Sequence, residues 1–274
     1  MTCHTQKMRF LMPLFLLSAC GESSPRLEAD AALPSDAAMQ TLSCLGREVS
    51  AARPHLVYLT QSAGYRHEVL PRSVEVLSAV SAGENLELTH SEDIHALLAP
   101  GALEGCAALV FYTSGELPVD AEEKNRLLDF VRRGGGFAGI HSASDTLYTW
   151  PEYGQLLGAR FNGHPWTQPV RIERVDVDHP AQGLAEASRI WTDEIYQFRD
   201  FIAEGRTLLL RLDPSSVDLA APGVVQESWS FPLAWASAYG QGRVFYSALG
   251  HGAIWEDEGF QQHLRRALRW VAGL

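Results

Sequence analysis

Strand-like and helix-like segments alternate along the chain between residues 55 and 140. Short, largely apolar stretches of strand length lie at residues 55–60, 86–89, 107–112 and 136–140. Residues 69–82 and 119–133, which separate them, carry apolar side chains at the spacing of an amphipathic helix. Strands that alternate with helices form a parallel sheet covered by helices on both faces. The pattern therefore predicts an α/β fold, a flavodoxin-like three-layer sandwich with a mainly parallel sheet.

The second half of the chain has a less regular pattern. Residues 170–177 largely alternate between apolar and polar side chains, as a half-exposed strand does. The turn Gly240-Gln241-Gly242 separates two strand-like runs, which predicts a hairpin over residues 232–249. Residues 260–271 predict a final amphipathic helix.

A glycine-rich turn at residues 134–136 leads into the most informative strand. The sequence Gly139-Ile140-His141-Ser142-Ala143 has the layout of a nucleophile elbow, in which a tight strand-to-helix turn lifts one side chain above the sheet. Here the lifted residue is His141. A capped helix start beside a buried histidine explains the same residues, because Ser142 and Ser144 are good helix N-caps. Both interpretations remain open at this point.

Polar side chains follow several of the predicted parallel strands. His67, Ser114 and His141 lie in the loops after residues 55–60, 107–112 and 136–140. Ligands of open α/β sheets bind beyond the carboxyl ends of the strands. We therefore expect these three residues to share one rim of the sheet.

The first 20 residues have the order of an export signal. Lys7 and Arg9 precede an apolar run at residues 10–16 that is too short to span a bilayer. Leu17-Ser18-Ala19-Cys20 then resembles a bacterial lipobox. This predicts a signal peptide over residues 1–19, lipidation of Cys20, and a lipid-anchored protein of the bacterial cell envelope, periplasmic or on the outer surface. An ordinary secretory signal is the alternative.

Residues 20–54 predict a flexible tether before a domain over residues 55–274. Small and polar side chains dominate the tether, and such a composition buries too little apolar area to offset chain entropy. Cys44 and Cys106 are the other cysteines that would remain after cleavage. In an oxidising compartment they could form a disulfide, or they could remain separate thiols.

Composition narrows the class of protein further. The 274 residues are 46% hydrophobic and 20% charged, which is typical of a globular chain with room for one large α/β domain. The formal net charge is −11. Because phosphate contacts need clustered lysine and arginine, this charge argues against nucleic acid as a partner.

Several short motifs, in this order along the chain, resemble the ThuA (trehalose-utilisation) family. They are Asp145-Thr146, Trp150-Pro151-Glu152-Tyr153, Leu157-Gly158, Phe161-Asn162-Gly163-His164-Pro165, Asp178-His179-Pro180, Asp193-Glu194-Ile195-Tyr196, Gly242-Arg243-Val244-Phe245-Tyr246 and Leu249-Gly250-His251. The resemblance covers about residues 55–274. It implies a class I glutamine amidotransferase-like fold and a link to disaccharide breakdown through 3-keto sugars.

The elbow departs from that of glutamine amidotransferases, which carry a nucleophilic cysteine there. This chain has His141 in that place. Without a thiolate at the elbow, acyl transfer loses its nucleophile. We therefore expect that the protein is not a glutaminase.

Histidines and carboxylates suggest a different chemistry. His67, His141 and His251 are candidate ligands of a divalent metal such as Zn²⁺. Such an ion could polarise the ketone of a 3-keto sugar, and a histidine or Glu194 could remove the neighbouring proton. Asp145 is a further catalytic candidate with His141 and Glu194. Without a metal, the same residues could act as an acid–base pair and hydrogen-bond donors.

Two classes of function follow for a carbohydrate partner. One is an exported hydrolase or lyase that acts on keto-glycosides; the other is a noncatalytic sugar-binding lipoprotein. Convergence of His67, His141, Glu194 and His251 within ligand distance favours catalysis. Aromatic residues can stack on sugar rings but are also common in cores. The candidate substrate-binding residues are Tyr65, Ser114, Trp150, His164 and Tyr196.

Overall fold

The computed structural model describes residues 42–48, 52–225 and 231–274, all within one compact unit that comprises Gln40–Leu274. The predicted signal peptide, Cys20 and most of the predicted tether lie outside the described residues, so they remain predictions. No helix in the described part of the chain combines the length and the apolar character needed to cross a bilayer.

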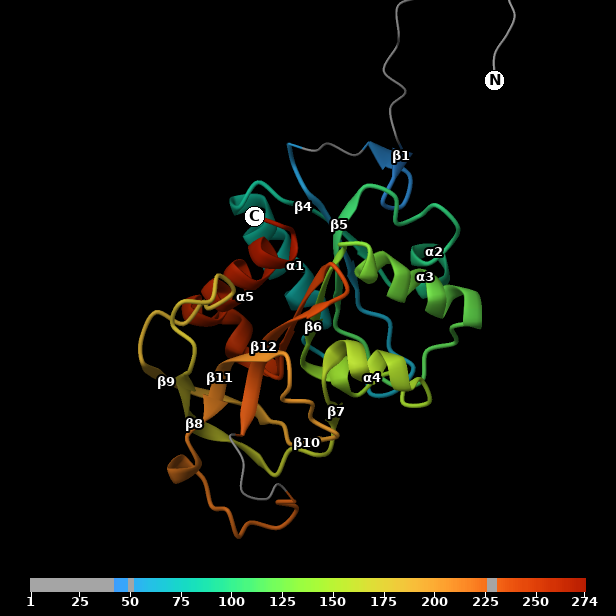
Figure 1. Cartoon of the computed structure of the whole chain (residues 1–274). Coiled ribbons are helices and arrows are strands. Elements are labelled where there is room, and N and C mark those ends of the chain that lie inside the picture. The colour runs from blue at the N-terminus through green and yellow to red at the C-terminus, as the bar shows by residue number, and fades with distance from the viewer. Residues whose placement is uncertain (1–41, 49–51, 226–230) are drawn as a thin grey trace, which may run out of the picture. The chain divides into compact units, whose positions relative to one another are not determined.

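A nine-stranded sheet with the order β4-β3-β5-β6-β13-β12-β11-β8-β9 forms the centre of the described structure (Figure 1). Its first five strands are parallel: β4 (Glu87–Ser91), β3 (His55–Leu59), β5 (Cys106–Phe111), β6 (Gly136–Ile140) and β13 (Gly242–Ser247). Each of the four strands expected between residues 55 and 140 is therefore present. Apart from the edge strand β4 and the amino end of β5, these strands are mostly buried, as their apolar sequences require.

The other four strands extend this sheet in antiparallel fashion. They are β12 (Pro232–Tyr239), β11 (Arg206–Leu212), β8 (Trp166–Arg174) and β9 (Ser188–Ile195). The expected hairpin is β12–β13, closed where Tyr239 faces Gly242. Although β9 is last in the strand order, it contacts the segment after β13. The antiparallel part therefore curls over the carboxyl ends of the parallel strands.

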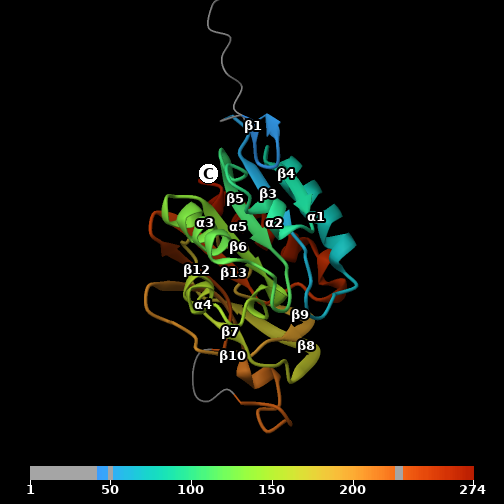
Figure 2. The ribbon, with the colours of Figure 1, turned by 90° about the vertical axis from the view of Figure 1, so that its right-hand side faces the viewer.

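Helices cover both faces of the sheet (Figure 2). Helices α1 (Leu70–Gly83) and α5 (Glu258–Val271) pack against each other, and α5 also contacts β13 and β6. Helices α3 (Ala121–Arg132) and α4 (Pro151–Leu157) contact β13 from the other side. A one-turn helix, α2 (Ile94–Leu97), precedes β5. The three-layer arrangement expected from the sequence is thus present.

Side-chain caps set where two of these helices begin. The Asp120 side chain accepts from the Glu123 N–H at 2.8 Å, and the Glu123 side chain accepts from the Asp120 N–H at 2.9 Å. This capping box starts α3 two residues later than predicted. Asp257 caps α5 by accepting from Gly259 and Phe260, so that helix begins two residues earlier than predicted.

A short hairpin within the predicted tether is bonded to the domain. Strands β1 (Leu42–Ser43) and β2 (Arg47–Glu48) pair, and Cys44 between them forms a disulfide with Cys106 at the start of β5. The two Cα atoms are 5.4 Å apart. Of the two possibilities that the sequence left open, the structure contains the disulfide.

Candidate active site

His141 directly follows β6 and begins a 3₁₀ turn, η1 (His141–Ser144), instead of the expected α-helix. Its backbone has φ of +48°, a left-handed conformation that is uncommon for a residue with a side chain. Such strained positions cluster at functional sites. A Cβ atom added at Gly139 would lie 2.6 Å from Leu157 Cδ1, so the Leu157 side chain would have to move to make room for it. The tight turn of the predicted elbow is present, while the side chain of His141 is fully buried, as in the alternative interpretation.

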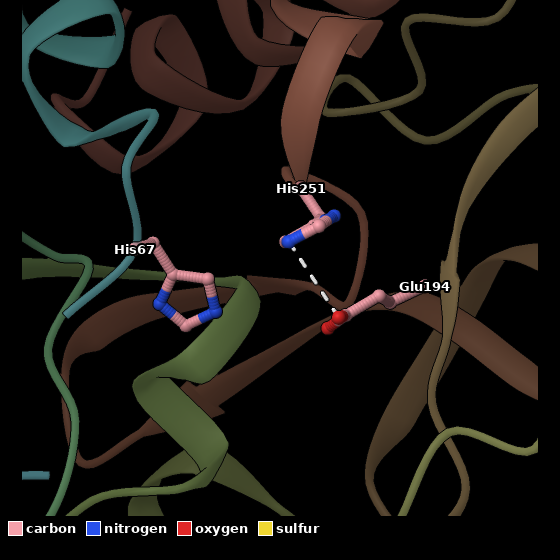
Figure 3. A group of neighbouring side chains, drawn as sticks. All are labelled: His67, Glu194 and His251. Carbon is pink, nitrogen blue, oxygen red and sulfur yellow. Dashed lines mark ion pairs between the residues drawn. The ribbon is translucent and has the colours of Figure 1, made fainter. Parts of the chain in front are cut away.

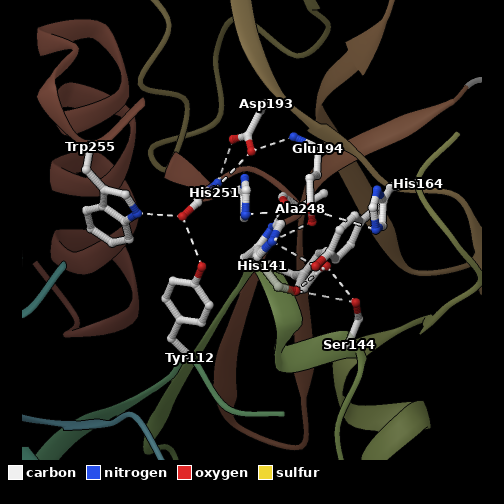
Figure 4. Close-up of polar contacts among 12 residues, drawn as sticks. Tyr112, His141, Ser144, His164, Asp193, Glu194, Ala248, His251 and Trp255 are labelled. Carbon is white, nitrogen blue, oxygen red and sulfur yellow. Dashed lines mark hydrogen bonds and ion pairs between the residues drawn. The ribbon is translucent and has the colours of Figure 1, made fainter. Parts of the chain in front are cut away.

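Both ring nitrogens of His141 have partners (Figure 4). Nδ1 lies 2.6 Å from the carbonyl oxygen of Ala248, and because a carbonyl only accepts, Nδ1 carries the proton. Nε2 of the neutral ring then accepts from the Tyr196 hydroxyl at 2.8 Å. Burial lowers the pKa of His141 and outweighs the opposing hydrogen bond and charge of Glu194. His141 is therefore neutral at neutral pH.

Glu194, near the end of β9, lies among a cluster of histidine side chains. Its Oε2 is 3.3 Å from His141 Nε2, and its Oε1 is 3.5 Å from His251 Nε2 and 3.8 Å from His164 Nε2. Burial raises the pKa of Glu194, but hydrogen bonding to His141 and the charges of His141, His251 and His164, in the protonated forms these rings take at low pH, outweigh burial and lower the pKa to about 2. The side chain is thus a carboxylate over the whole physiological range.

His67 reaches the same cluster of histidine side chains from the loop between β3 and α1. Its side chain is buried, and its ring centroid is 4.8 Å from that of His141 and 5.7 Å from that of His251. Burial, followed by the neighbouring His141 and His251, lowers the pKa of His67 to about 3. The imidazole is therefore neutral and available as a ligand.

Three of these residues make a candidate metal centre (Figure 3). One ligand atom each of His67, Glu194 and His251 lies within 4.8 Å of the others. Two imidazoles and a carboxylate form a donor set that suits Zn²⁺ and leaves a fourth position open. The sequence-based hypothesis had His141 in this set. The geometry favours Glu194 in its place, because both nitrogens of His141 are already engaged.

Asp193 holds two of these three residues through their backbone. Its buried carboxylate accepts from the N–H groups of Glu194 at 2.8 Å, His251 at 3.0 Å and Gly250 at 2.8 Å. Burial raises the pKa of Asp193, and the three N–H donors oppose that rise. This carboxylate therefore joins β9 to the loop after β13. Sequence reasoning missed its role, because its position beside Glu194 was the sole available signal.

Tyr112 and Trp255 support the site by binding the backbone next to His251. Both donate to the carbonyl oxygen of Gly250, the residue before His251 (Figure 4). The Tyr112 ring centroid is also 5.3 Å from that of His67 and 5.6 Å from that of His141. Tyr112 directly follows β5, so its place at the carboxyl rim was predictable, but its contact with the histidines was not.

The remaining predicted residues lie at different distances from this centre. His164 and Tyr196 contact it directly, through Glu194 and His141. Tyr65 is 65% exposed and lies edge-on to His67 with centroids 4.9 Å apart, at the rim. The hydroxyl of Ser114 donates to the backbone carbonyl of Tyr65, so Ser114 supports that loop.

Trp150 and Asp145 make other contacts. Trp150 is buried beside Tyr153, with the Lys124 ammonium 5.7 Å from its ring, so it packs between α3 and α4 and is not brought to the histidines. Asp145 accepts a hydrogen bond from the Tyr148 hydroxyl at 2.7 Å. Its catalytic role stays a prediction.

Comparison with known proteins gives one family. The sequence profile of the ThuA family, described as trehalose utilisation, matches residues 55–271. None of the curated proteins compared has significant sequence similarity to this chain.

Solved structures of ThuA-like proteins share the fold. A ThuA-like protein from Bacteroides uniformis has a TM-score of 0.68 and 23% identity, over 81% of this chain and 93% of that one. A ThuA-like protein from Parabacteroides merdae has a TM-score of 0.64 and 19% identity, over 81% and 90%. A glutamine amidotransferase from Thermotoga maritima has a TM-score of 0.49 and 12% identity, over 81% and 99%. The two ThuA-like structures confirm the predicted fold.

Proposed function

Because this chain belongs to the ThuA family, we propose that it acts on disaccharide-derived 3-keto glycosides by acid–base chemistry assisted by a divalent cation. The observation that carries this proposal is the convergence of His67, Glu194 and His251 beside a strained His141. His67 with its lowered pKa is neutral and Glu194 is ionised, and these are the protonation states that metal ligands need. A bound cation such as Zn²⁺ would supply polarisation of the ketone and a more acidic neighbouring C–H.

The pKa of Glu194 helps to assign its role. A carboxylate whose pKa is lowered to about 2 is a weak base at neutral pH, where efficient proton transfer needs a pKa near 7. Glu194 therefore suits the ligand role better than the base role. His141 is fully buried, so it acts through Glu194 and Tyr196 as a positioning residue.

His164 is the group best placed to move the proton. Its side chain is 40% exposed and its Nε2 faces Glu194 at 3.8 Å. In the proposed step His164 takes the proton from the carbon next to the ketone, and that electron pair forms a carbon–carbon double bond. The glycosidic carbon–oxygen bond breaks, and the departing oxygen receives the proton. The products are an unsaturated keto sugar and a free alcohol, and addition of water to the former would complete hydrolysis.

We propose further that the protein works in the bacterial cell envelope, anchored through a lipid on Cys20. The Cys44–Cys106 disulfide supports this location, because such bonds persist in oxidising compartments. The lipobox-like sequence at residues 17–20 supports the anchor.

The test of the activity combines metal analysis with turnover. Purified protein and the variants His67→Ala, Glu194→Gln and His251→Ala are assayed for bound metal by mass spectrometry and for cleavage of 3-keto-trehalose. We expect each variant to lose metal and to lose about 10²-fold or more in rate. His95→Gln is the matched control, since His95 is exposed and pairs with Glu123 on α3.

Full turnover by metal-free protein would remove the cation from the proposal. Binding of the sugar with no turnover would instead favour the noncatalytic sugar-binding alternative.

A further inference from the structure

Three polar side chains form a ledge beside the metal-binding candidates: Asp145, Tyr148 and Arg199. Asp145 and Tyr148 come from the segment after η1, and the Tyr148 hydroxyl donates to Asp145 Oδ1 at 2.7 Å. Arg199 comes from β10 (Phe198–Arg199), which pairs with β7 (Arg160–Phe161). The guanidinium charge of Arg199 acts on both Asp145 and Tyr148. Because β7 also contacts η1, the β7–β10 pair places Arg199 near the segment that carries Asp145 and Tyr148, and the three polar groups lie at or near the surface.

The ledge lies next to the cluster of histidines around Glu194. His164 Nε2 is 3.8 Å from Glu194 Oε1, and the His164 ring stacks on that of Phe161 in β7, with ring centroids 5.9 Å apart. Tyr148 and Arg199 are exposed and Asp145 is half-buried, so all three side chains can be reached from solvent. A molecule that reaches His164 would therefore extend over the ledge.

The backbone that carries the ledge is braced by polar contacts. Arg160 donates to the carbonyl oxygens of Leu147 at 3.2 Å and Trp150 at 2.6 Å. The carboxylate of Glu116 accepts from both the N–H and the hydroxyl of Thr149, at 3.1 and 2.7 Å. This part of the backbone is therefore ordered before a ligand binds. Binding then loses no free energy in ordering it, which raises the affinity.

We propose that Asp145, Tyr148 and Arg199 form the subsite for the second sugar ring, the ring that departs as the alcohol. This rests on the proposed function. A carboxylate accepts from sugar hydroxyls, a guanidinium donates to pairs of hydroxyl oxygens, and a phenol ring offers a flat face to the C–H side of a sugar. The site therefore selects disaccharides over simple alkyl glycosides. In this assignment Asp145 binds substrate and takes no part in proton transfer.

The experiment compares two substrates that differ in the departing group. Tyr148→Ala, Asp145→Asn and Arg199→Ala are tested with 3-keto-trehalose and with methyl 3-keto-glucoside. We expect KM for the disaccharide to rise about tenfold, with kcat and both constants for the methyl glycoside changed less than about twofold. Calorimetric binding of both sugars is measured in parallel. Tyr239→Ala is the matched control, because Tyr239 is a partly exposed tyrosine at the amino-end side of the sheet, against Arg132.

The outcomes separate the subsite from the reaction. Weakened binding of the disaccharide alone, with no turnover by any form, would support the subsite and overturn the proposed reaction. Equal effects on both sugars, or none, in folded variants would overturn the subsite while turnover still supports the reaction. Failure of the unmodified protein to bind 3-keto-trehalose would overturn both. Thermal melting checks the fold, and Asp145→Asn keeps the shape if Tyr148→Ala is unstable.

Discussion

The backbone N–H of His251 donates to Asp193 Oδ1 at 3.0 Å, so a buried carboxylate fixes a candidate ligand that is 58 residues away in the chain. The same oxygen accepts from the N–H of Glu194. Two candidate metal ligands from different elements thus share one anchor, and the distance between their side chains depends on it.

Asp193→Asn should loosen this anchor, because an amide replaces one acceptor oxygen by a donor that faces a backbone N–H. We expect metal affinity to fall about 10- to 100-fold, the usual effect of losing an outer partner of a metal ligand. Competition with a chelating dye measures it. Asp176→Asn is the control, since Asp176 also accepts from two backbone N–H groups, those of Asp178 and His179, in the loop between β8 and β9, at the other end of β9 from Glu194. Unchanged affinity in Asp193→Asn would contradict the positioning role.

His141→Ala should reduce both stability and turnover. The substitution leaves the buried carbonyl of Ala248 without its donor, which costs about 1–3 kcal/mol. It also removes the hydrogen-bond partner of Tyr196 and the neighbour of Glu194, so we expect turnover to fall about 10- to 100-fold. His263→Ala is the matched control, because His263 is equally buried and contacts Ser247 on β13. It should lose stability at unchanged turnover, and equal activity of the two variants would exclude His141 from the chemistry.

The stability of the fold should decrease on acidification below about pH 6.5. Burial lowers the pKa of His263 from 6.5 to about 3, so the unfolded chain binds a proton in this window that the folded chain does not. Stability is full above pH 6.5 and is lost as the pH falls, by up to about 1.4 kcal/mol per pH unit from this group. Urea unfolding at pH 7 and pH 5 measures the slope. His263→Leu should flatten it, and an unchanged slope would show that other groups dominate.

Reduction of the Cys44–Cys106 disulfide should lower the melting temperature without affecting turnover. The bond closes a sequence separation of 62 residues, for which loop entropy predicts up to about 4 kcal/mol. Cys106 starts β5, at the opposite end of the strand from the histidines, so the site should persist. Melting scans with and without reductant test this, with Cys44→Ala/Cys106→Ala as the form that reductant cannot shift. A single melting temperature for all samples would refute it.

Cys20→Ala should release the protein from membranes. The lipobox-like sequence makes Cys20 the predicted lipid acceptor. Membrane fractionation and labelling with a fatty-acid probe compare this variant with Cys3→Ala, whose cysteine lies in the predicted signal peptide. Retention of Cys20→Ala in the membrane fraction would remove the anchor from the proposal.

Sequence periodicity predicted the parallel half of the sheet because burial on both faces imposes apolar runs. Residues 136–140 are both the expected strand and β6. The elbow at His141 followed from the glycines around it, since few residues fit such a turn. The short helix α4 was not predicted, because its seven residues are too few for a periodic signal and their packing decides.

Side-chain partners across long separations were beyond the sequence. Asp193 and Gly250 are 57 residues apart, and their contact depends on how β9 curls over the rim. Trp150 could equally have lined a sugar site, and its packing beside Tyr153 and Lys124 is a tertiary outcome. Family resemblance placed Glu194 near the histidines. The sequence could not show that one carboxylate oxygen faces His141 and the other faces His251.

The position of Glu194 on the edge strand β9 has a consequence for how the site can come apart. An edge strand is paired on one side only, here with β8, and such elements open locally at a lower free energy than the centre of a sheet. Opening of β9 would withdraw Glu194 from the histidines while the parallel strands stay folded. A cation that needs Glu194 would therefore slow amide hydrogen exchange in β9 more than in β3 or β5, and the exchange rate of this strand would report occupancy of the centre.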